Sequence, residues 1–522
     1  MSNSANLDPS EHFDVLIVGA GISGLGSAYH LKQQCPEKTF VVLEAKETFG
    51  GTWHTHRYPG VRSDSDLYTY GYRFKPWLGV PIATRDEINA YLGEVISEND
   101  LAGHIRYRHL IAHASWSSAG NLWTVIARRG DTGETCRFTT RFLWMCQGYY
   151  RHAKGYTPDW PGMETFKGPI VHPQTWPEDL DYTGKRVIVI GSGASAATVV
   201  PAMAERAGQV TMLQRSPTYY FPMRNAMALA EELRMLEIDE RWVHEIVRRR
   251  TLLEQNAIRA RCRTEPELAK ADLLALVRKY LPADYDFDKH FVPSYRPWQQ
   301  RVCFVPDGDL FKAIASGKAT VVTDHIERFT PEGILLSSGE TLPADIIVTA
   351  TGLLLSCQGD IELEVDGTPV RLSDTITYYG MMFAGIPNLA WIFGYFRQAW
   401  TLRVDLVGDF ICRLLAHMDR KGARRVTPTL RPEDKDMTIG PWAPPEGFSS
   451  GYLMRQQHLM PKTGDKPEWQ NTQDYATEKV MLPAVDLDDA ILVYGYEATE
   501  DILRSPGDAG PPGRVSWQAK ET

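Results

Sequence analysis

The stretch Val15-Leu16-Ile17-Val18-Gly19-Ala20-Gly21-Ile22-Ser23-Gly24 decides the fold of the N-terminal part of the chain. An apolar run leads into glycines at positions 19, 21 and 24, and helical spacing follows, which predicts a strand, a tight turn and a helix. Gly19 permits the turn, Gly21 lets a pyrophosphate approach the backbone, and Gly24 lets the helix pack on the strand. The next apolar strand ends at Glu44, where a carboxylate can accept a hydrogen bond from a ribose 2′-OH. The stretch therefore predicts a dinucleotide-binding α/β domain.

A second glycine-rich turn follows the apolar run 186–190 and consists of Gly191, Ser192, Gly193, Ala194, Ser195 and Ala196. Alanine in the third glycine position is common in NADP-binding versions of this turn. The next strand ends in Gln214-Arg215-Ser216 rather than in an acid. A carboxylate would repel a 2′-phosphate, whereas a guanidinium forms charge-assisted hydrogen bonds to it. We predict that this second fold binds NADPH, with Arg215 and Ser216 at the 2′-phosphate.

Length and composition indicate a multidomain globular protein. A chain of 522 residues exceeds what one hydrophobic core normally holds. Its net charge of −9 disfavours nucleic acid as a partner, because phosphate binding needs clustered excess Lys and Arg. We interpret the local basic run Arg248-Arg249-Arg250 as a solvated helix face.

The cysteines and the apolar runs indicate the cellular compartment in which the protein works. The seven cysteines form no C-x-x-C pair, which argues against a disulfide framework, a zinc ribbon and a redox pair. Free thiols suit a reducing cytoplasm. The longest apolar runs, 346–355 and 389–396, are shorter than the ~18 residues that a spanning helix needs. The polar N-terminus carries no secretion signal, so we predict a soluble cytoplasmic protein without a transmembrane segment.

Two long motifs connect these turns. The stretch between the two glycine turns contains the complete pattern F-x-G-x-x-x-H-x-x-x-W-P, with Phe166, Gly168, His172, Trp176 and Pro177 at its fixed positions. It resembles the fingerprint of the Baeyer–Villiger branch of the flavin-dependent monooxygenases. The sister branch, which oxidises nitrogen and sulfur, usually ends this motif with Tyr or Phe followed by Lys or Arg. Residues 50–64 are similar to the second long motif of the same enzymes, and residues 400–405 look closest to their ethionamide-activating branch.

The resemblance assigns residues to an FAD site in the first fold. It implies that Gly51, Thr52 and Trp53 line the FAD, that Tyr70 is a flavin neighbour and that Ile111 lies near the adenine end. It also implies that Asp64 lies near the reaction centre and that Arg301 is the active-site arginine. His172 and Trp176 belong, by the same resemblance, to a linker that couples the position of the NADPH domain to catalysis.

The resemblance also implies a reaction. NADPH reduces FAD, reduced flavin adds O₂ at C4a, and the peroxyflavin inserts one oxygen atom next to the carbonyl of an apolar ketone to give an ester or lactone, with side activity on thioethers. A peroxide anion in a water-poor pocket needs a fixed positive partner, and a guanidinium suits this because it cannot deprotonate at working pH. We assign that role to Arg301, held in place by Asp64.

Three other functions, and a metal site, are alternatives to a Baeyer–Villiger monooxygenase. A flavin monooxygenase that mainly oxidises sulfur or nitrogen is the nearest alternative. A flavin disulfide reductase would need a close cysteine pair, and a non-catalytic binding module would not need the intact motifs. His54 and His56 lack a third ligand nearby, so we interpret them as surface residues and predict no metal site.

We predict an α/β protein with two Rossmann-like domains and a helical insertion. The predicted divisions are residues 1–155 for the first part of the FAD domain, 156–182 for the linker, 183–345 for the NADP domain with its helical insertion at 222–285, and 346–522 for the second part of the FAD domain and a mobile tail from Ser505. Substrate-lining residues are expected at Tyr68, in the helical insertion and in the C-terminal third.

Overall fold

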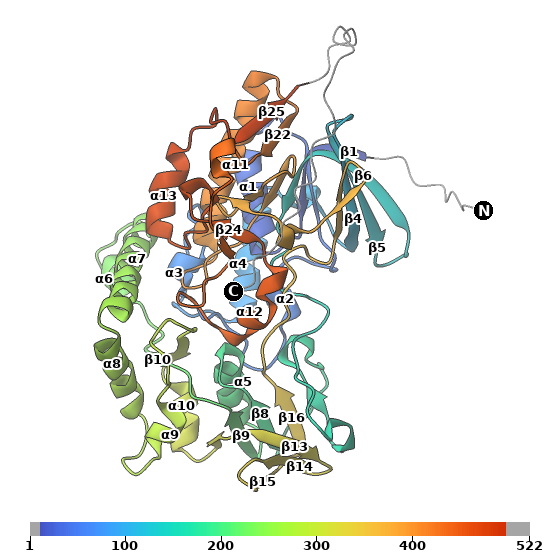
Figure 1. Cartoon of the computed structure of the whole chain (residues 1–522). Coiled ribbons are helices and arrows are strands. Elements are labelled where there is room, and N and C mark those ends of the chain that lie inside the picture. Colours follow the sequence, from blue (N-terminus) through green and yellow to red (C-terminus); the bar gives the residue numbers. More distant parts are fainter. Residues whose placement is uncertain (1–10, 497–522) are drawn as a thin grey trace, which may run out of the picture.

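The computed structural model describes residues 11–496, and the expected mobile tail lies outside this range. Two sheets organise it, the larger in the upper half of Figure 1 and the smaller in the lower half. The larger sheet has the strand order β18-β17-β4-β5-β6-β1-β2-β3, and β21 also pairs with β6. Its strands are β1 (Glu11–Val18), β2 (Phe40–Leu43), β3 (Ile105–Arg106), β4 (His109–Ser117), β5 (Leu122–Arg129), β6 (Thr135–Met145), β17 (Glu362–Val365), β18 (Thr368–Val370) and β21 (Leu389–Trp391).

Strand β1 is the centre of this sheet, because it pairs in parallel with both β2 and β6. Residues 15–18 are buried, as expected for a parallel strand covered on both faces. Helix α1 (Ile22–Gln34) follows the glycine turn and packs against α11 (Thr401–Lys421). A Cβ added at Gly24 would lie 1.8 Å from the carbonyl oxygen of Gly19, so only glycine allows the helix to start this close to the strand.

The smaller sheet is entirely parallel, in the order β12-β9-β8-β16-β7. Its elements are β7 (Ile170–Val171), β8 (Arg186–Ile190), α5 (Ala194–Ala204), β9 (Gln209–Gln214), α10 (Asp309–Ala315), β12 (Ala319–Thr323) and β16 (Ile346–Thr349). Strand β7 lies inside the predicted linker, and β16 lies just beyond the predicted boundary at residue 345. The larger sheet is mixed, with parallel pairs around β1 and antiparallel pairs among β4, β5 and β6, and the smaller sheet is parallel. Both carry a glycine turn, which confirms the predicted α/β class.

The helical insertion forms one side of the molecule (Figure 1). It contains α6 (Ala228–Met235), α7 (Glu240–Thr264) and α8 (Pro266–Arg278), between β10 (Tyr220–Met223) and α9 (Phe287–Phe291). Within α7, the side chains of Arg249 and Arg250 are 75% and 64% exposed, as predicted for a solvated face.

The prediction is wrong for Arg248, whose side chain is 5% exposed. Its guanidinium donates to the carbonyl oxygens of Tyr68, Thr69 and Gly71 at 3.2, 3.2 and 2.9 Å. Helical spacing turns position 248 toward the larger domain, while its two neighbours face solvent. Arg248 thereby ties α7 to α3 (Leu67–Tyr70).

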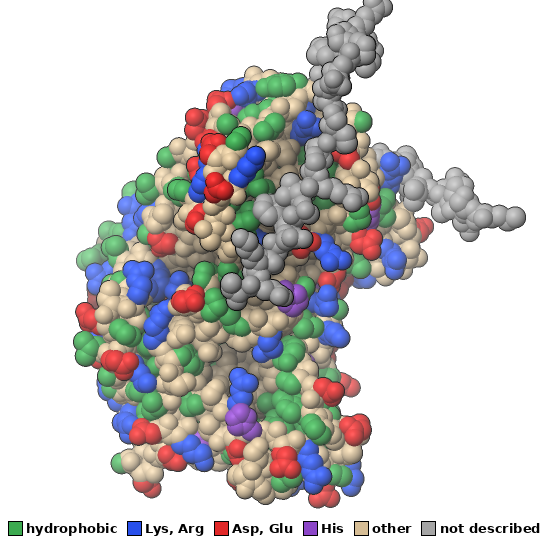
Figure 2. Space-filling view, in the orientation of Figure 1, with side chains coloured by type: hydrophobic (Ala, Val, Ile, Leu, Met, Phe, Trp, Pro, Cys, Tyr) green, Lys and Arg blue, Asp and Glu red, His purple; other side chains and the backbone are tan. Residues whose placement is uncertain are grey.

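The remaining elements cover the two sheets and close the chain. They are α2 (Thr52–Thr55), α4 (Arg85–Glu98), β11 (Cys303–Pro306), β13 (Ile326–Thr330), β14 (Gly333–Leu336), β15 (Thr341–Pro343), β19 (Thr377–Tyr378), β20 (Met382–Phe383), β22 (Arg425–Pro428), β23 (Ile439–Pro441), α12 (Gly451–Gln456), β24 (Lys462–Gly464), α13 (Tyr475–Ala484) and β25 (Leu492–Gly495). Among residues 11–496, no helix combines the length and the apolar character that a bilayer crossing requires. Acidic and basic side chains are interspersed over the face shown in Figure 2.

Candidate active site

One large cavity of about 1150 Å³ runs past both glycine turns. It opens where β1 and β6 end, and ligands of α/β sheets bind at the carboxyl ends of strands. Most of the site residues predicted from sequence line it: Gly19, Gly21, Ser23, Glu44, Gly51, Thr52, Trp53, Asp64, Tyr70, Ile111, Gly193, Ala194, Ser195 and Arg301. The fold therefore gathers side chains from the two predicted dinucleotide-binding regions around one space.

The first turn presents backbone to this cavity. Gly21 precedes α1, and no side chain of the described residues caps that helix, so its first N–H groups are available to a ligand. The carboxylate of Glu44 accepts hydrogen bonds from the N–H groups of Ala20 (2.7 Å) and Lys46 (2.8 Å) while still facing the cavity. Glu44 thus fixes the loop that surrounds it. Gly24 does not line the cavity and serves the contact between helix and strand.

The segment 50–64 joins the two domains. The Trp53 indole N–H donates to the Tyr70 hydroxyl at 2.9 Å, and both residues line the cavity. Further along, Arg62 forms two contacts with Asp309 of α10, at 2.5 and 3.2 Å. This long motif therefore runs from the first cofactor region to a helix of the second domain.

Asp64 and Arg301 form an ion pair inside the cavity, although 237 positions separate them in sequence. Arg301 Nε lies 2.6 Å from Asp64 Oδ2, and Nη1 donates to the carbonyl oxygen of Phe396 at 3.0 Å. Nη2 lies 3.4 Å from Ser65 Oγ. Burial alone would lower the pKa of Arg301, but the charge and the hydrogen bond of Asp64, together with the influence of Tyr452 and Tyr149, outweigh burial and raise that pKa. The guanidinium is thus permanently charged and held at three points.

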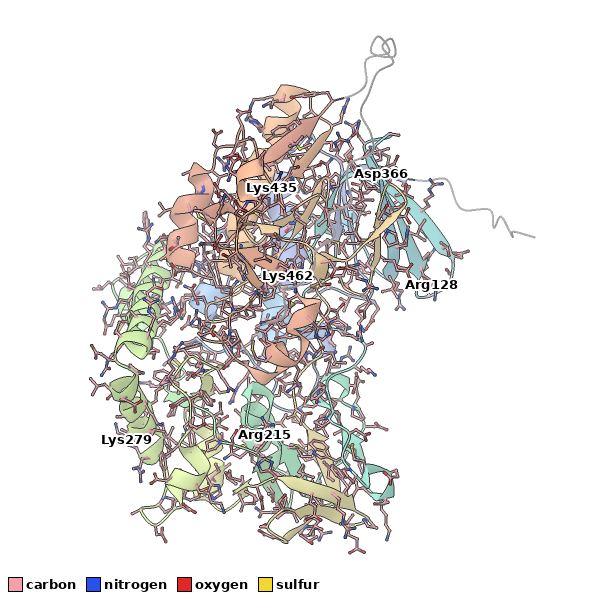
Figure 3. The ribbon with its side chains drawn as sticks, viewed as in Figure 1. Arg128, Arg215, Lys279, Asp366, Lys435 and Lys462 are labelled. Carbon is pink, nitrogen blue, oxygen red and sulfur yellow. The ribbon has the colours of Figure 1, made fainter. Side chains whose placement is uncertain are left out.

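The second turn reaches the cavity only in part. Gly193, Ala194 and Ser195 line it, whereas Gly191, Ser192, Ala196, Arg215 and Ser216 do not. Ala196 is buried in the core of the smaller domain. Arg215 and Ser216 are exposed at the end of β9, and Figure 3 shows Arg215 beside α5. A cation at this edge is open to a ligand that extends from the turn.

The five fixed residues of the linker motif lie outside the cavity. Phe166 is buried against the smaller sheet, and an added Cβ at Gly168 would lie 2.2 Å from the carbonyl oxygen of Asp345. His172 Nε2 lies 3.0 Å from the carbonyl oxygen of Gly352, and its Nδ1 accepts from the N–H of Gln174 at 3.1 Å. Burial lowers the pKa of His172. Trp176 lines a separate cavity of about 430 Å³; Pro177 lines neither.

Several site expectations are wrong. Tyr68 is buried, its hydroxyl donates to the carbonyl oxygen of Gly79 at 3.2 Å, and it does not line the cavity. Within the described part of the chain, no residue of α6, α7 or α8 lines it either. His54 and His56 are not surface residues: the His54 side chain is 12% exposed and lies 2.9 Å from Glu47, and His56 lines the cavity. Their loop folds inward between the two domains.

Sequence reasoning missed the aromatic wall of the cavity. Tyr149, Tyr150, Trp400 and Tyr452 all line it. The first two come four and five residues beyond the end of β6, which was the available signal, since side chains after a buried parallel strand face the ligand edge of its sheet. Tyr452 comes from α12, and no local pattern connects it to this wall.

The cavity suits a dinucleotide flavin. Its volume exceeds the ~300–1,000 Å³ of ordinary small-molecule pockets. Apart from Arg301 Nε, which faces Asp64 in the ion pair, three buried polar atoms of its lining have no hydrogen-bond partner among the described residues: His56 Nδ1, Gln147 Oε1 and Gln398 Nε2. Buried polar groups are normally satisfied, so these atoms fit a polar ligand.

Comparisons with known proteins identify the family of the chain. A flavin-binding monooxygenase-like family model matches residues 81–228, and an NAD(P)-binding Rossmann-like domain matches residues 17–74. The chain is 45% identical over 482 residues to the FAD-containing monooxygenase EthA of Mycobacterium tuberculosis (strain ATCC 25618 / H37Rv), covering 92% of this chain and 97% of EthA.

Solved structures give the same result. An NADP-bound oxidised steroid monooxygenase aligns with a TM-score of 0.66 at 27% identity, covering 81% of this chain and 88% of that one. An open crystal structure of cyclohexanone monooxygenase aligns with a TM-score of 0.71 at 19% identity over 93% and 100% of the two chains, which bears on the fold alone. The predicted cofactors, FAD and NADPH, are confirmed, as is the resemblance to the flavin monooxygenases. The chain belongs to the family of FAD-containing, flavin-binding monooxygenase-like enzymes.

Proposed function

We propose that this monooxygenase catalyses Baeyer–Villiger oxidation: with NADPH and O₂ it inserts one oxygen atom next to the carbonyl of an apolar ketone, giving an ester or lactone, and it also oxidises thioethers. The observation that carries the proposal is the Asp64–Arg301 pair in the cavity, with 2.6 Å between Nε and Oδ2. Attack on a ketone carbonyl develops negative charge on oxygen. A fixed guanidinium supplies the counter-charge without reorganising at the moment of reaction.

The residues around the cavity have distinct tasks in this proposal. The turn at 19–24, together with Gly51, Thr52 and Trp53, would hold FAD, and the second turn with Arg215 would hold NADPH. Bound FAD, once reduced by NADPH, supplies the activation of O₂ that amino-acid side chains lack. Arg301 would hold the positive charge, and Asp64 would orient it. Residues 50–64 and the linker with His172 would hold the two domains in a fixed position relative to each other.

A substrate panel tests the proposal. Purified holoenzyme with NADPH and O₂ should convert short apolar ketones into esters, with one NADPH consumed per ester. Thioethers of matched size serve as the comparison. If thioethers gave sulfoxides and no ketone gave an ester, the main reaction would be sulfur oxidation, the alternative within the same family.

Gly193 provides a test of the NADPH site. An added Cβ at Gly193 meets no described protein atom within 4 Å, so Gly193→Ala should fold and retain FAD. Its methyl group would occupy space that a pyrophosphate needs, so the KM for NADPH should rise roughly ten-fold, the factor that corresponds to losing one charge-assisted hydrogen bond. Steady-state kinetics with varied NADPH measures this. Gly24→Ala is the contrasting control, since its methyl group would collide with the Gly19 carbonyl oxygen and should abolish FAD retention.

Arg215 provides a test of coenzyme choice. Arg215→Ala should raise the KM for NADPH roughly ten-fold, because a guanidinium–phosphate hydrogen bond contributes more than a neutral one. The KM for NADH should stay the same, since NADH has no 2′-phosphate. Equal changes for the two coenzymes would assign the 2′-phosphate to another group. Arg249→Ala, on the solvated face of α7, is the matched surface control.

A further inference from the structure

Three tyrosines form a hydroxyl cluster in the cavity wall. The hydroxyls of Tyr149 and Tyr150 are hydrogen-bonded to each other, and those of Tyr149 and Tyr452 are 3.3 Å apart. All three residues line the cavity, and Tyr149 is 8% exposed. The cluster joins residues after β6 to residues of α12, which are about 300 positions apart in sequence.

Ring stacking and backbone pairing hold Tyr149 and Tyr150 in place. Tyr149 stacks on Trp400 with 5.4 Å between ring centroids and 8° between planes. The Trp400 indole N–H donates to Ser23 Oγ at 2.7 Å, so the wall is tied to the first glycine turn. Tyr150 is fixed by an isolated backbone bridge to Leu355. The hydroxyl positions are therefore set by packed rings and by backbone rather than by flexible side chains.

The three hydroxyls together have one more hydrogen than their mutual hydrogen bonds use. Three phenols carry three hydroxyl hydrogens, and the two hydrogen bonds of the cluster use two of them. Burial raises the pKa of Tyr149 and of Tyr150 well above the ordinary value for tyrosine, so both phenols keep their hydrogens. One neutral O–H is therefore left over, and wherever Tyr149 donates to one of its two neighbours it is on Tyr150 or Tyr452, open to a partner in the cavity.

The cluster lines the same cavity as the charged pair. The guanidinium of Arg301 acts electrostatically on Tyr150 and Tyr452, and Asp64 acts on Tyr452. Because Asp64 and the Phe396 carbonyl already engage Arg301, a neutral ligand has a separate neutral donor in the same cavity as the cation. An oxygen acceptor satisfies such an O–H, whereas a thioether sulfur is only a weak acceptor.

We propose that Tyr149, Tyr150 and Tyr452 form the carbonyl-recognition site of the substrate pocket, donating one hydrogen bond to the oxygen of an apolar ketone and thereby favouring ketones over thioethers. This inference rests on the proposed function and adds to it the residues that select the substrate class. Tyr149 is the positioning residue at the centre, and Tyr150 and Tyr452 present the donor.

Direct binding tests the proposal without turnover. The Kd values of phenylacetone and of benzyl methyl sulfide, which have the same ring and chain length, are measured by titration calorimetry on oxidised FAD-loaded enzyme without NADPH. The double variant Tyr150→Phe with Tyr452→Phe should weaken phenylacetone binding roughly ten-fold, the value of one hydrogen bond, and the single variant that removes the donating hydroxyl should do the same. The affinity for benzyl methyl sulfide should be nearly unchanged.

Controls separate the possible results. Tyr494→Phe removes a hydroxyl that donates to the Leu487 carbonyl oxygen at 2.7 Å outside the cavity, and it should leave both affinities unchanged. Equal losses for ketone and thioether, or no loss for either in all variants, would overturn the proposal. If the double variant fails to retain FAD, both single variants are measured, because only the one that removes the donating hydroxyl should lose affinity.

A separate assay tests the proposed function itself. Wild-type enzyme is supplied with NADPH, O₂ and phenylacetone, and the absence of benzyl acetate would show that the proposed function is wrong. A ketone-specific loss of affinity in the tyrosine variants would uphold the recognition site even then. Ester formation by wild-type enzyme, with unchanged phenylacetone affinity in the variants, would reject the recognition site alone.

Discussion

Replacing Arg301 with alanine is expected to lower oxygenated product formation by ~10²–10³-fold, the usual cost of removing one preorganised electrostatic donor. The guanidinium is held by Asp64, by the Phe396 carbonyl oxygen and by Ser65, so its charge has a fixed position in the cavity. Transfer of reducing equivalents from NADPH to FAD does not need it in this proposal and should continue.

Two measurements separate these effects. Anaerobic addition of NADPH should bleach the flavin absorbance of Arg301→Ala, while ester formation in air falls and hydrogen peroxide accumulates. Arg301→Lys is the matched control, because it keeps a charge but cannot engage Asp64 and the Phe396 carbonyl oxygen with one planar group. It should lie between wild type and alanine. Ester formation by Arg301→Ala at a rate close to that of the wild type would show that the catalytic assignment is wrong.

Replacing Arg403 with methionine is expected to lower the free energy of unfolding by about 3–5 kcal/mol, because it leaves a buried carboxylate unpaired. The Arg403 and Glu478 side chains are 0% and 2% exposed, with Nε 3.1 Å from Oε2. The guanidinium also donates to the carbonyl oxygen of Tyr379 at 2.6 Å, and Glu478 accepts from the hydroxyls of Tyr395 and Thr472. This network fixes α13 to α11 and to Tyr395 in the cavity wall.

Urea unfolding of FAD-loaded enzyme measures the change, as a lower midpoint at an unchanged m-value. Arg249→Met removes an exposed partner of Glu245 and is the matched control, with an expected cost of about 0–1 kcal/mol. The double variant Arg403→Met with Glu478→Leu should recover part of the loss, since no unpaired charge remains. If Arg403→Met unfolded at the same midpoint as the control, the buried pair would contribute nothing to stability.

Local patterns were readable wherever the chemistry depends on neighbours in sequence. Glycines 19, 21 and 24 follow a buried strand at fixed spacing, and the close contact of Gly24 with the Gly19 carbonyl oxygen explains that spacing. The second turn and residues 50–64 could likewise be recognised from short patterns. Residues 50–64 face the cavity over much of their length, and the second turn faces it in part. Such motifs combine backbone geometry with a predicted ligand contact in a few consecutive residues, so they can be recognised without a structure.

Burial within a helix was harder to predict. Three consecutive arginines in α7 look alike in sequence, yet Arg248 alone donates to three backbone carbonyls of the larger domain. Its burial depends on which element covers that face of α7, and helical spacing does not name the covering element. The inward fold of the loop with His54 and His56 was missed for the same reason.

The sequence by itself determined two dinucleotide-binding folds, the cofactors FAD and NADPH, and membership of the flavin monooxygenases, because each depends on short-range spacing of glycines and charged groups. Only the tertiary structure decided that Asp64 meets Arg301 and that Tyr149 and Tyr150 meet Tyr452. These contacts join segments hundreds of residues apart. Their distances follow from how the two sheets and α12 pack, and no local periodicity encodes that packing.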